Sequence, residues 1–574
     1  HMRGFSLCDG KKTCYVNIDV PDREDLLNEL NYCLQHRGSF QKLIMHNAPF
    51  DLKVLHKEGC TEVTSQIFCT QTAAHLINEN IPNDLKYLAQ HILKVSDTLT
   101  YAQAERYGYN SPEFIEYATN DAIWTWQLHE YFNRVLYQQK LDKLFYEVEM
   151  PFQFVLMDLA INGVQIDDVE IDRLDKIVSK DILDMEFKLR DLAGIKYQTQ
   201  GNLFIEEMEV LSGTNMRSSQ QLVDIIQNRL GLVIEEKTDT GNPSVGKATL
   251  LRLKGQHDFI DLLRKYKTAT KLSQGFLKPF PGFYDADGRV RGSVNNCIAR
   301  TGRLSMSKPN NQQLPKLNKE YPIDFRATII APEGRSLIVS DYGGQELRVL
   351  TQITKDKGLI DAFQNDKDIH LETTNKSFDL GIPDECLYSR HPDHEKIKKE
   401  NKADRDKTKN CVVFPIIYGT TAYGVSQNLA VSEEVAQGYI DDFLDLYPGV
   451  REGIERCSAY LKTHKYVYTL SGRRRRLYDL TPKAYRQAFN FLIQGYSADM
   501  IRLAATNVRN AGLAHPEWDM KIVLIVHDEI VVEVNDEYIE EAKAAVKEGM
   551  ETAVQMCVPL VTEIGVGKKY SEAK

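Results

Sequence analysis

The sequence predicts a multidomain protein that combines α/β and α+β regions, and its length and two strand patterns support this prediction. The chain has 574 residues, enough for about three or four domains of roughly 100–200 residues each. In residues 521–534, two apolar and largely β-branched runs flank His527-Asp528-Glu529, which predicts a buried hairpin with acids at its tip. Residues 336–340 predict a strand that ends at Asp341, and 345–350 predict the start of a helix. Burying carboxylates is costly unless a cation or hydrogen bonds compensate their charge. Two aspartates at strand ends can hold two divalent metals, the arrangement that catalyses displacement at phosphorus.

Composition limits what the whole surface can bind. The formal net charge is −10, so nucleic acid would have to meet local basic strips. The ten cysteines form no C-x-x-C pair, which favours reduced thiols in a cytoplasmic compartment and argues against a zinc ribbon. We expect no membrane span and no signal peptide, since the chain shows neither a long apolar run nor the pattern of a leader.

The amino-terminal region contains two short acidic motifs. A predicted strand over 42–45 is followed by Asn47-x-x-Phe50-Asp51, and Tyr117-x-x-x-Asp121 places two side chains on one helix face. In this order and spacing the region resembles the DnaQ-like 3′–5′ proofreading exonucleases, which have a ribonuclease H-like fold. The resemblance implies that Asp51 and Asp121 bind metal and that Tyr117 positions the attacking water.

The first motif of that family, a D-x-E on the opening strand, is not recognisable. Asp22-Arg23-Glu24 has the spacing, but it follows a proline and begins an acidic helix start. Residues 4–7 and 13–16 resemble the second and third strands of the fold. We therefore expect the chain to begin just after the motif and its exonuclease activity to be weak or absent.

The carboxyl-terminal half contains a longer series of motifs after a mostly helical stretch over 146–290. In order, they are Thr301-Gly302-Arg303-Leu304-Ser305, Asp341-Tyr342-x-x-x-Glu346-Leu347-Arg348, Arg405-x-x-x-Lys409, Tyr418-Gly419, Arg486-x-x-x-Asn490-x-x-x-Gln494-Gly495-x-x-Ala498-Asp499 and Val526-His527-Asp528-Glu529. This series resembles the family A (Pol I-like) DNA polymerases, of phage or bacterial type, over nearly the whole chain.

The resemblance implies a right-hand polymerase, with palm, fingers and thumb, beside the exonuclease-like domain. The expected domains are the exonuclease-like domain over 1–145, the thumb and palm-connecting helices over 146–290, the first part of the palm over 291–365, the fingers over 366–495 and the second part of the palm over 496–574.

The family also implies roles for residues of the catalytic centre. Asp341 and Asp528 would hold two Mg²⁺ ions, for which Mn²⁺ could substitute, and Glu529 beside them would be either catalytic or a supporting acid. The residues expected around the incoming dNTP are Arg405, Lys409, His370, Phe414, Tyr418 and Glu346, of which Lys409 would also act in catalysis and Glu346 would exclude a 2′-hydroxyl.

A further set is expected to contact DNA. Minor-groove acceptors are shared by A·T and T·A pairs, so donors there test pair geometry without reading sequence. The expected contacts are Arg303, Arg486, Asn490, Gln494 and His527, with Lys271 on the basic helix 264–272 meeting the phosphate backbone. The run Arg473-Arg474-Arg475-Arg476 predicts either a phosphate contact or a solvated basic turn.

Two departures from the family pattern stand out. Gly343 and Gly344 replace the serine and glutamine frequent in the family, so any side-chain contact from them is lost. Lys409 and Tyr418 are nine residues apart where the family has eight, and one extra residue turns a helix by about 100°. Either a helical bulge absorbs it, or Val413 and Ile417 take the positions assigned to Phe414 and Tyr418; we favour the bulge.

The sequence thus predicts template-directed DNA synthesis by two-metal nucleotidyl transfer, in replication or repair. The expected partners are primer–template DNA and dNTPs, with replisome proteins undefined, for a monomer in the cytoplasm of a bacterial cell or bacterial host. One alternative is a single-subunit RNA polymerase, against which Glu346 and the V-H-D-E motif argue. Another is a non-catalytic DNA-binding protein, which the two intact palm aspartates disfavour.

Overall fold

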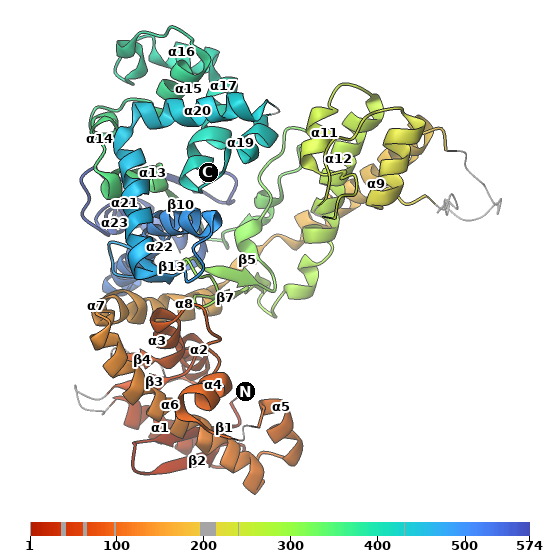
Figure 1. The fold of residues 1–574 in the computed structure, drawn as a ribbon. Coiled ribbons are helices and arrows are strands. Elements are labelled where there is room, and N and C mark those ends of the chain that lie inside the picture. The colour runs from red at the N-terminus through yellow and green to blue at the C-terminus, as the bar shows by residue number, and fades with distance from the viewer. Residues whose placement is uncertain are drawn as a thin grey trace, which may run out of the picture.

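The computed structural model describes residues 2–35, 42–60, 66–96, 99–195, 214–238, 240–429 and 431–574. Figure 1 shows three lobes: an amino-terminal domain in red and orange, a helical arm in yellow and green, and a larger lobe in cyan and blue. Among the described residues, no helix is long and apolar enough to cross a membrane.

The larger lobe is built on a four-stranded antiparallel sheet in the order β13-β14-β10-β15. Its strands are β10 (Arg335–Tyr342), β13 (Lys521–Val526), β14 (Glu529–Asn535) and β15 (Thr562–Gly567). Val526 pairs with Glu529, so His527 and Asp528 form the hairpin turn, and Asp341 lies opposite Glu529 on the neighbouring strand. The predicted hairpin and the strand ending near Asp341 are both confirmed.

Both faces of this sheet are buried, which explains why its strands are apolar almost throughout. Successive side chains point to opposite faces. Ile338 and Val532 pack in a core shared with the upper helices, whereas Leu337 and Val531 pack in a core shared with the helical arm. The long helix α22 (Pro482–Ala514) packs against α23 (Ile539–Glu551), and both helices contribute to the core that contains Ile338 and Val532.

The helices that follow β10 fall in two expected regions, residues 345–364 in the first part of the palm and residues 369–464 in the fingers. They are α13 (Gln345–Thr354), α14 (Lys357–Gln364), α15 (Ile369–Phe378), α16 (His394–Glu400), α17 (Lys402–Thr408), α18 (Phe414–Ile417), α19 (Ala422–Leu429), α20 (Glu433–Leu446) and α21 (Pro448–His464). A short hairpin of β11 (Tyr466–Tyr468) and β12 (Arg474–Arg476) follows. The expected boundary between residues 495 and 496 falls inside α22.

Next to the helical arm, strands β5 (Val164–Ile166), β6 (Arg289–Val290) and β9 (Ile329–Ile330) form a separate antiparallel sheet in the order β6-β5-β9. Its principal helices are α9 (Asp168–Leu192), α10 (Ser219–Asp224), α11 (Lys247–Arg252) and α12 (Asp258–Leu272), in agreement with the helical pattern predicted before residue 290. The connecting helix α8 (Met150–Asn162) runs alongside β13.

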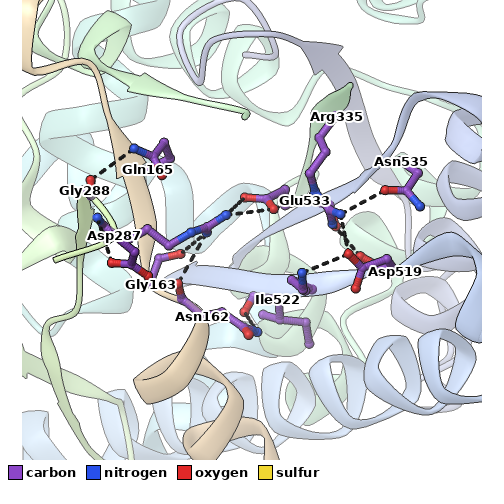
Figure 2. A network of polar contacts seen from close by, with 12 residues as sticks. Asn162, Gly163, Gln165, Asp287, Gly288, Arg335, Asp519, Ile522, Glu533 and Asn535 are labelled. Carbon is purple, nitrogen blue, oxygen red and sulfur yellow. Dashed lines mark hydrogen bonds and ion pairs between the residues drawn. The ribbon is translucent and has the colours of Figure 1, made fainter. Parts of the chain in front are cut away.

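A buried ionic network connects the base of the arm to the four-stranded sheet, as Figure 2 shows. Glu533 of β14 is 1% exposed, and its carboxylate accepts two hydrogen bonds from Arg289, at 2.9 and 3.0 Å. Arg335 Nε lies 2.6 Å from the same carboxylate. Arg289 also donates to the carbonyls of Asn162 and Gly163. Removing one partner of such a buried pair costs about 3–5 kcal/mol, so the network holds the arm's attachment point.

The amino-terminal domain has two small sheets covered by helices. Its elements are β1 (Gly4–Cys8), β2 (Thr13–Asn17), β3 (Leu43–Met45), β4 (Ile67–Cys69), α1 (Arg23–Gln35), α2 (Ala48–Lys57), α3 (Thr70–Ile77), α4 (Leu85–Leu88) and the long α6 (Pro112–Gln138). The strands expected over 4–7 and 13–16 are confirmed, and so is the helix start at Asp22-Arg23-Glu24.

Candidate active site

Two aspartates lie close together where the central strands of the four-stranded sheet end. Asp341 lies near the end of β10 and Asp528 in the turn between β13 and β14, and the backbone N–H of Tyr342 donates to the carbonyl of Asp528 at 3.3 Å. Burial, and secondly the negative charge of Asp341, raise the pKa of Asp528 to about 7. Asp341 Oδ1 is buried, and no described residue donates to it. The pair therefore concentrates negative charge and leaves one carboxylate oxygen without a donor, although Lys574 lies near the other oxygen of Asp341.

This donor set fits a divalent cation. Carboxylate oxygens are the ligands that Mg²⁺ prefers, and Mg²⁺ ordinarily keeps several positions for water and phosphate oxygens. Within the described ranges, no group of three or more His, Cys, Asp and Glu side chains forms a metal site by itself. Two aspartates with an orphaned oxygen leave positions for phosphate and water.

Glu529 follows Asp528 in sequence but has different neighbours. It is 1% exposed and accepts hydrogen bonds from Tyr570 and Lys574 near the carboxyl end of the described chain. Lys574 Nζ also lies 3.6 Å from Asp341 Oδ2. Of the two roles considered for Glu529, these contacts favour that of a supporting acid. Sequence reasoning missed Tyr570 and Lys574, because they belong to no motif.

A carboxylate-centred cluster forms the wall beside the aspartates. Glu346, at the start of α13, is ion-paired with Arg303, and its Oε2 accepts a hydrogen bond of 2.7 Å from the Tyr418 hydroxyl. Burial and the adjacent Glu346 raise the pKa of Tyr418, so this phenol stays a donor. Phe414 stacks on Tyr418 with a centroid separation of 6.4 Å and an interplanar angle of 20°. The structure thus brings four predicted residues together.

A cationic group lies on the neighbouring helices. Asp368 caps the start of α15 and pairs with Arg405 Nε at 2.8 Å. Burial, then the positive charge of Arg405, lowers the pKa of His370 to about 3, and its Nδ1 is buried with no hydrogen-bond partner among the described residues. Lys409 Nζ lies 5.9 Å from the centroid of the Phe414 ring. His370 is therefore neutral, while Arg405 and Lys409 supply fixed positive charge.

The register between Lys409 and Tyr418 is resolved by a π-helical turn, η10 (Lys409–Val413). Such a turn absorbs one extra residue within an α-helix. Val413 and Ile417 are consequently buried in the core, at 0% and 1% exposed, and Phe414 and Tyr418 face the site. The predicted bulge is confirmed, and the alternative register is wrong.

One face of α22 packs against the end of α18. A Cβ at Gly419, where φ is +70°, would come within 2.7 Å of Arg486 Cβ, so glycine is required for the close approach. Asn490 Nδ2 donates to the carbonyl of Ile417 at 3.3 Å, and Gln494 follows one turn later and is half-buried. His527 lies in the hairpin turn, and partial desolvation of its ring, followed by the charge of Arg303, lowers its pKa.

The structure contradicts both interpretations of the arginine run over residues 473–476, as a phosphate contact or as a solvated turn. Arg473 and Arg475 are buried, at 3% and 7% exposed, and they pair with acids rather than meeting solvent or presenting a free phosphate site. Arg475 and Arg476 both contact Glu79 of the amino-terminal domain. A run of arginines resembles a surface feature in sequence, because arginine is rarely buried unless it is paired.

The basic helix α12 is only partly available for phosphate. Arg264 is ion-paired with Glu320, and Lys267 Nζ donates to the carbonyl of Val245 at 2.7 Å. Lys271 lines an open cavity of about 590 Å³, together with Arg217.

The residues of the two exonuclease motifs are described by the structure, and among the described residues no group of three or more His, Cys, Asp and Glu side chains gathers around them. Asp121 is ion-paired with Lys86, whose Nζ also lies 4.2 Å from the centroid of the Tyr117 ring. Asp51 belongs to α2, and burial raises its pKa to about 7. Asp22 and Glu24 are exposed at the start of α1. Because an ammonium group occupies Asp121, these residues do not fit the metals that the exonuclease family implies.

This arrangement is that of a polymerase with a palm and fingers. Asp341 and Asp528 lie where strands of the sheet end, and Glu346 lies beside them. Arg405 and Lys409 supply positive charge from neighbouring helices. Family comparison agrees: the model described as "DNA polymerase family A" matches residues 196–572, and the model described as "3'-5' exonuclease" matches 2–137. The chain belongs to DNA polymerase family A. The resemblance noted in the sequence is confirmed, although the missing first exonuclease motif stays a prediction.

Curated relatives are bacterial enzymes. The chain is 33% identical over 507 residues to "DNA polymerase I, thermostable" of Thermus filiformis, covering 86% of this chain and 55% of the relative. It is 31% identical over 471 residues to DNA polymerase I of Pseudomonas aeruginosa, covering 80% and 47%. The chain therefore spans about half the length of these relatives.

A solved structure confirms the fold. The POL domain of Pol1 from M. smegmatis, in complex with DNA primer-template and dNTP, superposes with a TM-score of 0.81 and 24% sequence identity. The match covers 99% of this chain and 92% of that chain. The expected right-hand polymerase fold with an exonuclease-like domain is confirmed.

Proposed function

We propose that this chain performs template-directed DNA synthesis, transferring a nucleotide from a dNTP to a primer 3′-hydroxyl. The observation that carries the proposal is the half-buried pair Asp341 and Asp528, which raises the pKa of Asp528 and leaves Asp341 Oδ1 without a donor among the described residues. Glu346 and Tyr418 lie beside this pair and are hydrogen-bonded to each other. Membership of family A supports it.

Asp341 and Asp528 would hold two Mg²⁺ ions, with Mn²⁺ as a possible substitute. When bound, the ions supply Lewis-acid activation of the 3′-hydroxyl and neutralise charge on the triphosphate. Arg405 and Lys409 bind and orient the triphosphate from one helix face, and fixed cations suit charge that grows in the transition state. Neutral His370 adds a hydrogen bond to a phosphate oxygen.

Glu346 selects the sugar. Its carboxylate is held from both sides, by Arg303 and by the Tyr418 hydroxyl, so it cannot turn away from a 2′-hydroxyl. The stacked rings of Phe414 and Tyr418 provide the surface against which the nascent base pair closes. The Glu346 carboxylate, held in this way, excludes a ribonucleotide because it fills the space that a 2′-hydroxyl would occupy.

Primer–template DNA is the proposed partner. Arg303, Arg486, Asn490, Gln494 and His527 would contact the minor groove, where donors sense pair geometry independently of sequence. Lys271 would meet the backbone, a contact that positions DNA without reading it. A monomer acting in bacterial cytoplasm, and the domain boundaries given above, stay predictions.

Single-nucleotide insertion tests the proposal. Wild-type enzyme with Mg²⁺ is given a primer annealed to four templates that differ only in the templating base, and each dNTP separately. Extension with the complementary dNTP alone supports template-directed synthesis. Absence of extension, or equal extension with all four dNTPs on every template, would refute it; extension with rNTPs in preference to dNTPs would favour the RNA polymerase alternative.

A further inference from the structure

A cluster of four buried charges joins the amino-terminal domain to the palm. Its members are Glu149, Arg473, Asp499 and Arg502, which are 1%, 3%, 1% and 0% exposed. Arg473 Nε and Nη2 lie 2.9 and 2.5 Å from Asp499 Oδ1, and Arg473 is also ion-paired with Glu149. Arg502 Nε lies 3.4 Å from Glu149 Oε1. The two positive and two negative charges balance.

Glu149 brings the amino-terminal domain into this cluster. Its sequence neighbours Val148 and Met150 pack in the core of that domain, with strands β3 and β4. Arg473 follows the turn after β11, and Asp499 and Arg502 belong to α22 of the palm. The acid therefore sits where the exonuclease-like domain meets the polymerase.

Both arginines lie against Gly302, Arg502 through a hydrogen bond and Arg473 through close packing. Arg502 Nη2 donates to the Gly302 carbonyl at 2.6 Å, while Nη1 donates to the carbonyl of Ala498 at 2.9 Å. Gly302 has φ +81°, and a Cβ at that position would come 2.9 Å from Arg473 Nε. Arg473 thus fills the space where a side chain would lie, and the two arginines fix the peptide that precedes Arg303.

Arg303 connects Gly302 to Glu346 and Tyr418, the residues proposed to face the nucleotide sugar. It is ion-paired with Glu346, and Glu346 accepts the Tyr418 hydroxyl. The contacts from Glu149 to Glu346 are continuous. Stability alone is a weak reason to bury such a cluster, since buried ion pairs are often no better than apolar packing. The contacts with Gly302 supply a more specific role.

We propose that Arg473 and Arg502 are positioning residues for the sugar-selecting wall, and that Glu149 lets the exonuclease-like domain set their geometry. The amino-terminal domain is then a part of the polymerase site's support, independent of any nuclease activity. This inference rests on the proposed polymerase function, and it assigns that domain a role in discrimination between dNTPs and rNTPs.

The test compares Glu149→Gln and Arg502→Lys with Glu79→Gln, all in the full chain. Glu79 is a matched control because it is buried at the same domain interface and paired with Arg475 and Arg476, but does not reach Gly302. The readouts are kcat and KM for insertion of a dNTP and the matching rNTP, with Tm as a measure of folding. Wild-type primer extension is measured first, so that failure of the proposed function is recognised separately.

We expect Glu149→Gln and Arg502→Lys to change the rNTP/dNTP ratio of kcat/KM by about 2- to 30-fold, the range for residues acting through a packed network. Glu79→Gln should lower Tm but leave the ratio unchanged. In a Glu346→Ala background the effect of Arg502→Lys on the ratio should vanish, since the two act in series. An unchanged ratio in both variants, or a fold-change that persists without Glu346, would overturn the proposal.

Discussion

The Tyr418 hydroxyl donates to Glu346 Oε2 at 2.7 Å, which ties the end of the finger helix to the first turn of the helix that follows Asp341. These residues come from motifs 72 positions apart. Because Arg303 holds the other oxygen of the same carboxylate, Glu346 is fixed in place before any nucleotide arrives.

Glu346→Ala should admit ribonucleotides. Truncation opens space beside the sugar, and a group of this size changes discrimination by on the order of 10-fold or more. The measurement is the rNTP/dNTP ratio of kcat/KM for single insertion. Glu346→Gln, which preserves the volume, is the matched control and should retain most of the discrimination. An unchanged ratio in the alanine variant would place sugar selection elsewhere.

Asp528→Asn should stabilise the metal-free protein at high pH. The folded-state pKa of Asp528, about 7, lies above its ordinary value of 3.8, so ionising this group destabilises the fold. The penalty is absent below about pH 4, grows as pH rises, and is complete above about pH 7. In EDTA, the Tm gain of the variant over wild type should thus be larger at pH 8 than at pH 5.

Glu563→Gln serves as the control for this comparison, because Glu563 is an exposed acid opposite Asp341 on β15. Its Tm difference from wild type should be small at both pH values. A gain for Asp528→Asn that is equal at pH 5 and pH 8, or a loss at pH 8, would show that burial and the charge of Asp341 do not raise the pKa of Asp528.

The amino-terminal domain should degrade single-stranded DNA weakly or not at all. Lys86 neutralises Asp121, and the described residues supply no complete set of acids for two metals. The measurement is degradation of a 5′-labelled single strand in Mg²⁺ or Mn²⁺ without dNTPs. Robust degradation that disappears in Asp51→Ala would contradict this expectation and would mean that other acids complete the site.

DNA affinity should fall steeply with salt despite the net acidic chain. Basic strips displace condensed counterions, and the slope of log K against log salt is about 0.9 per phosphate contact on duplex DNA. Lys271→Ala should reduce the slope by about one contact. Lys547→Ala, an exposed lysine on α23, should leave it unchanged. A slope near zero for wild type would rule out phosphate contacts.

Much of this architecture could be predicted from local sequence patterns. The hairpin at His527-Asp528, the strand before Asp341 and the helix start at Asp22 each have their signal within a few residues, and all are confirmed. The π-helical turn could be predicted as well, because a one-residue excess between two fixed motif positions must be absorbed somewhere.

Long-range electrostatic partners could not be predicted in this way. Glu149 and Arg473 are 324 positions apart, and Lys86 and Asp121 are 35 apart with no motif in common. Buried pairing depends on which surfaces meet, and single-sequence periodicity carries no information about that. The arginine run over residues 473–476 therefore resembles a surface feature in the sequence, and no sequence signal indicates that Lys86 pairs with Asp121.

Primer extension by matched palm variants tests the central claim most directly. Wild type, Asp341→Asn and Asp528→Asn are compared under single-turnover conditions with all four dNTPs and Mg²⁺, and DNA binding is measured alongside. Metal-held charge stabilisation is worth several kcal/mol, so each variant should lose about 10³-fold or more in rate while binding DNA nearly as well as wild type. Extension at a near-wild-type rate by either variant would contradict the account.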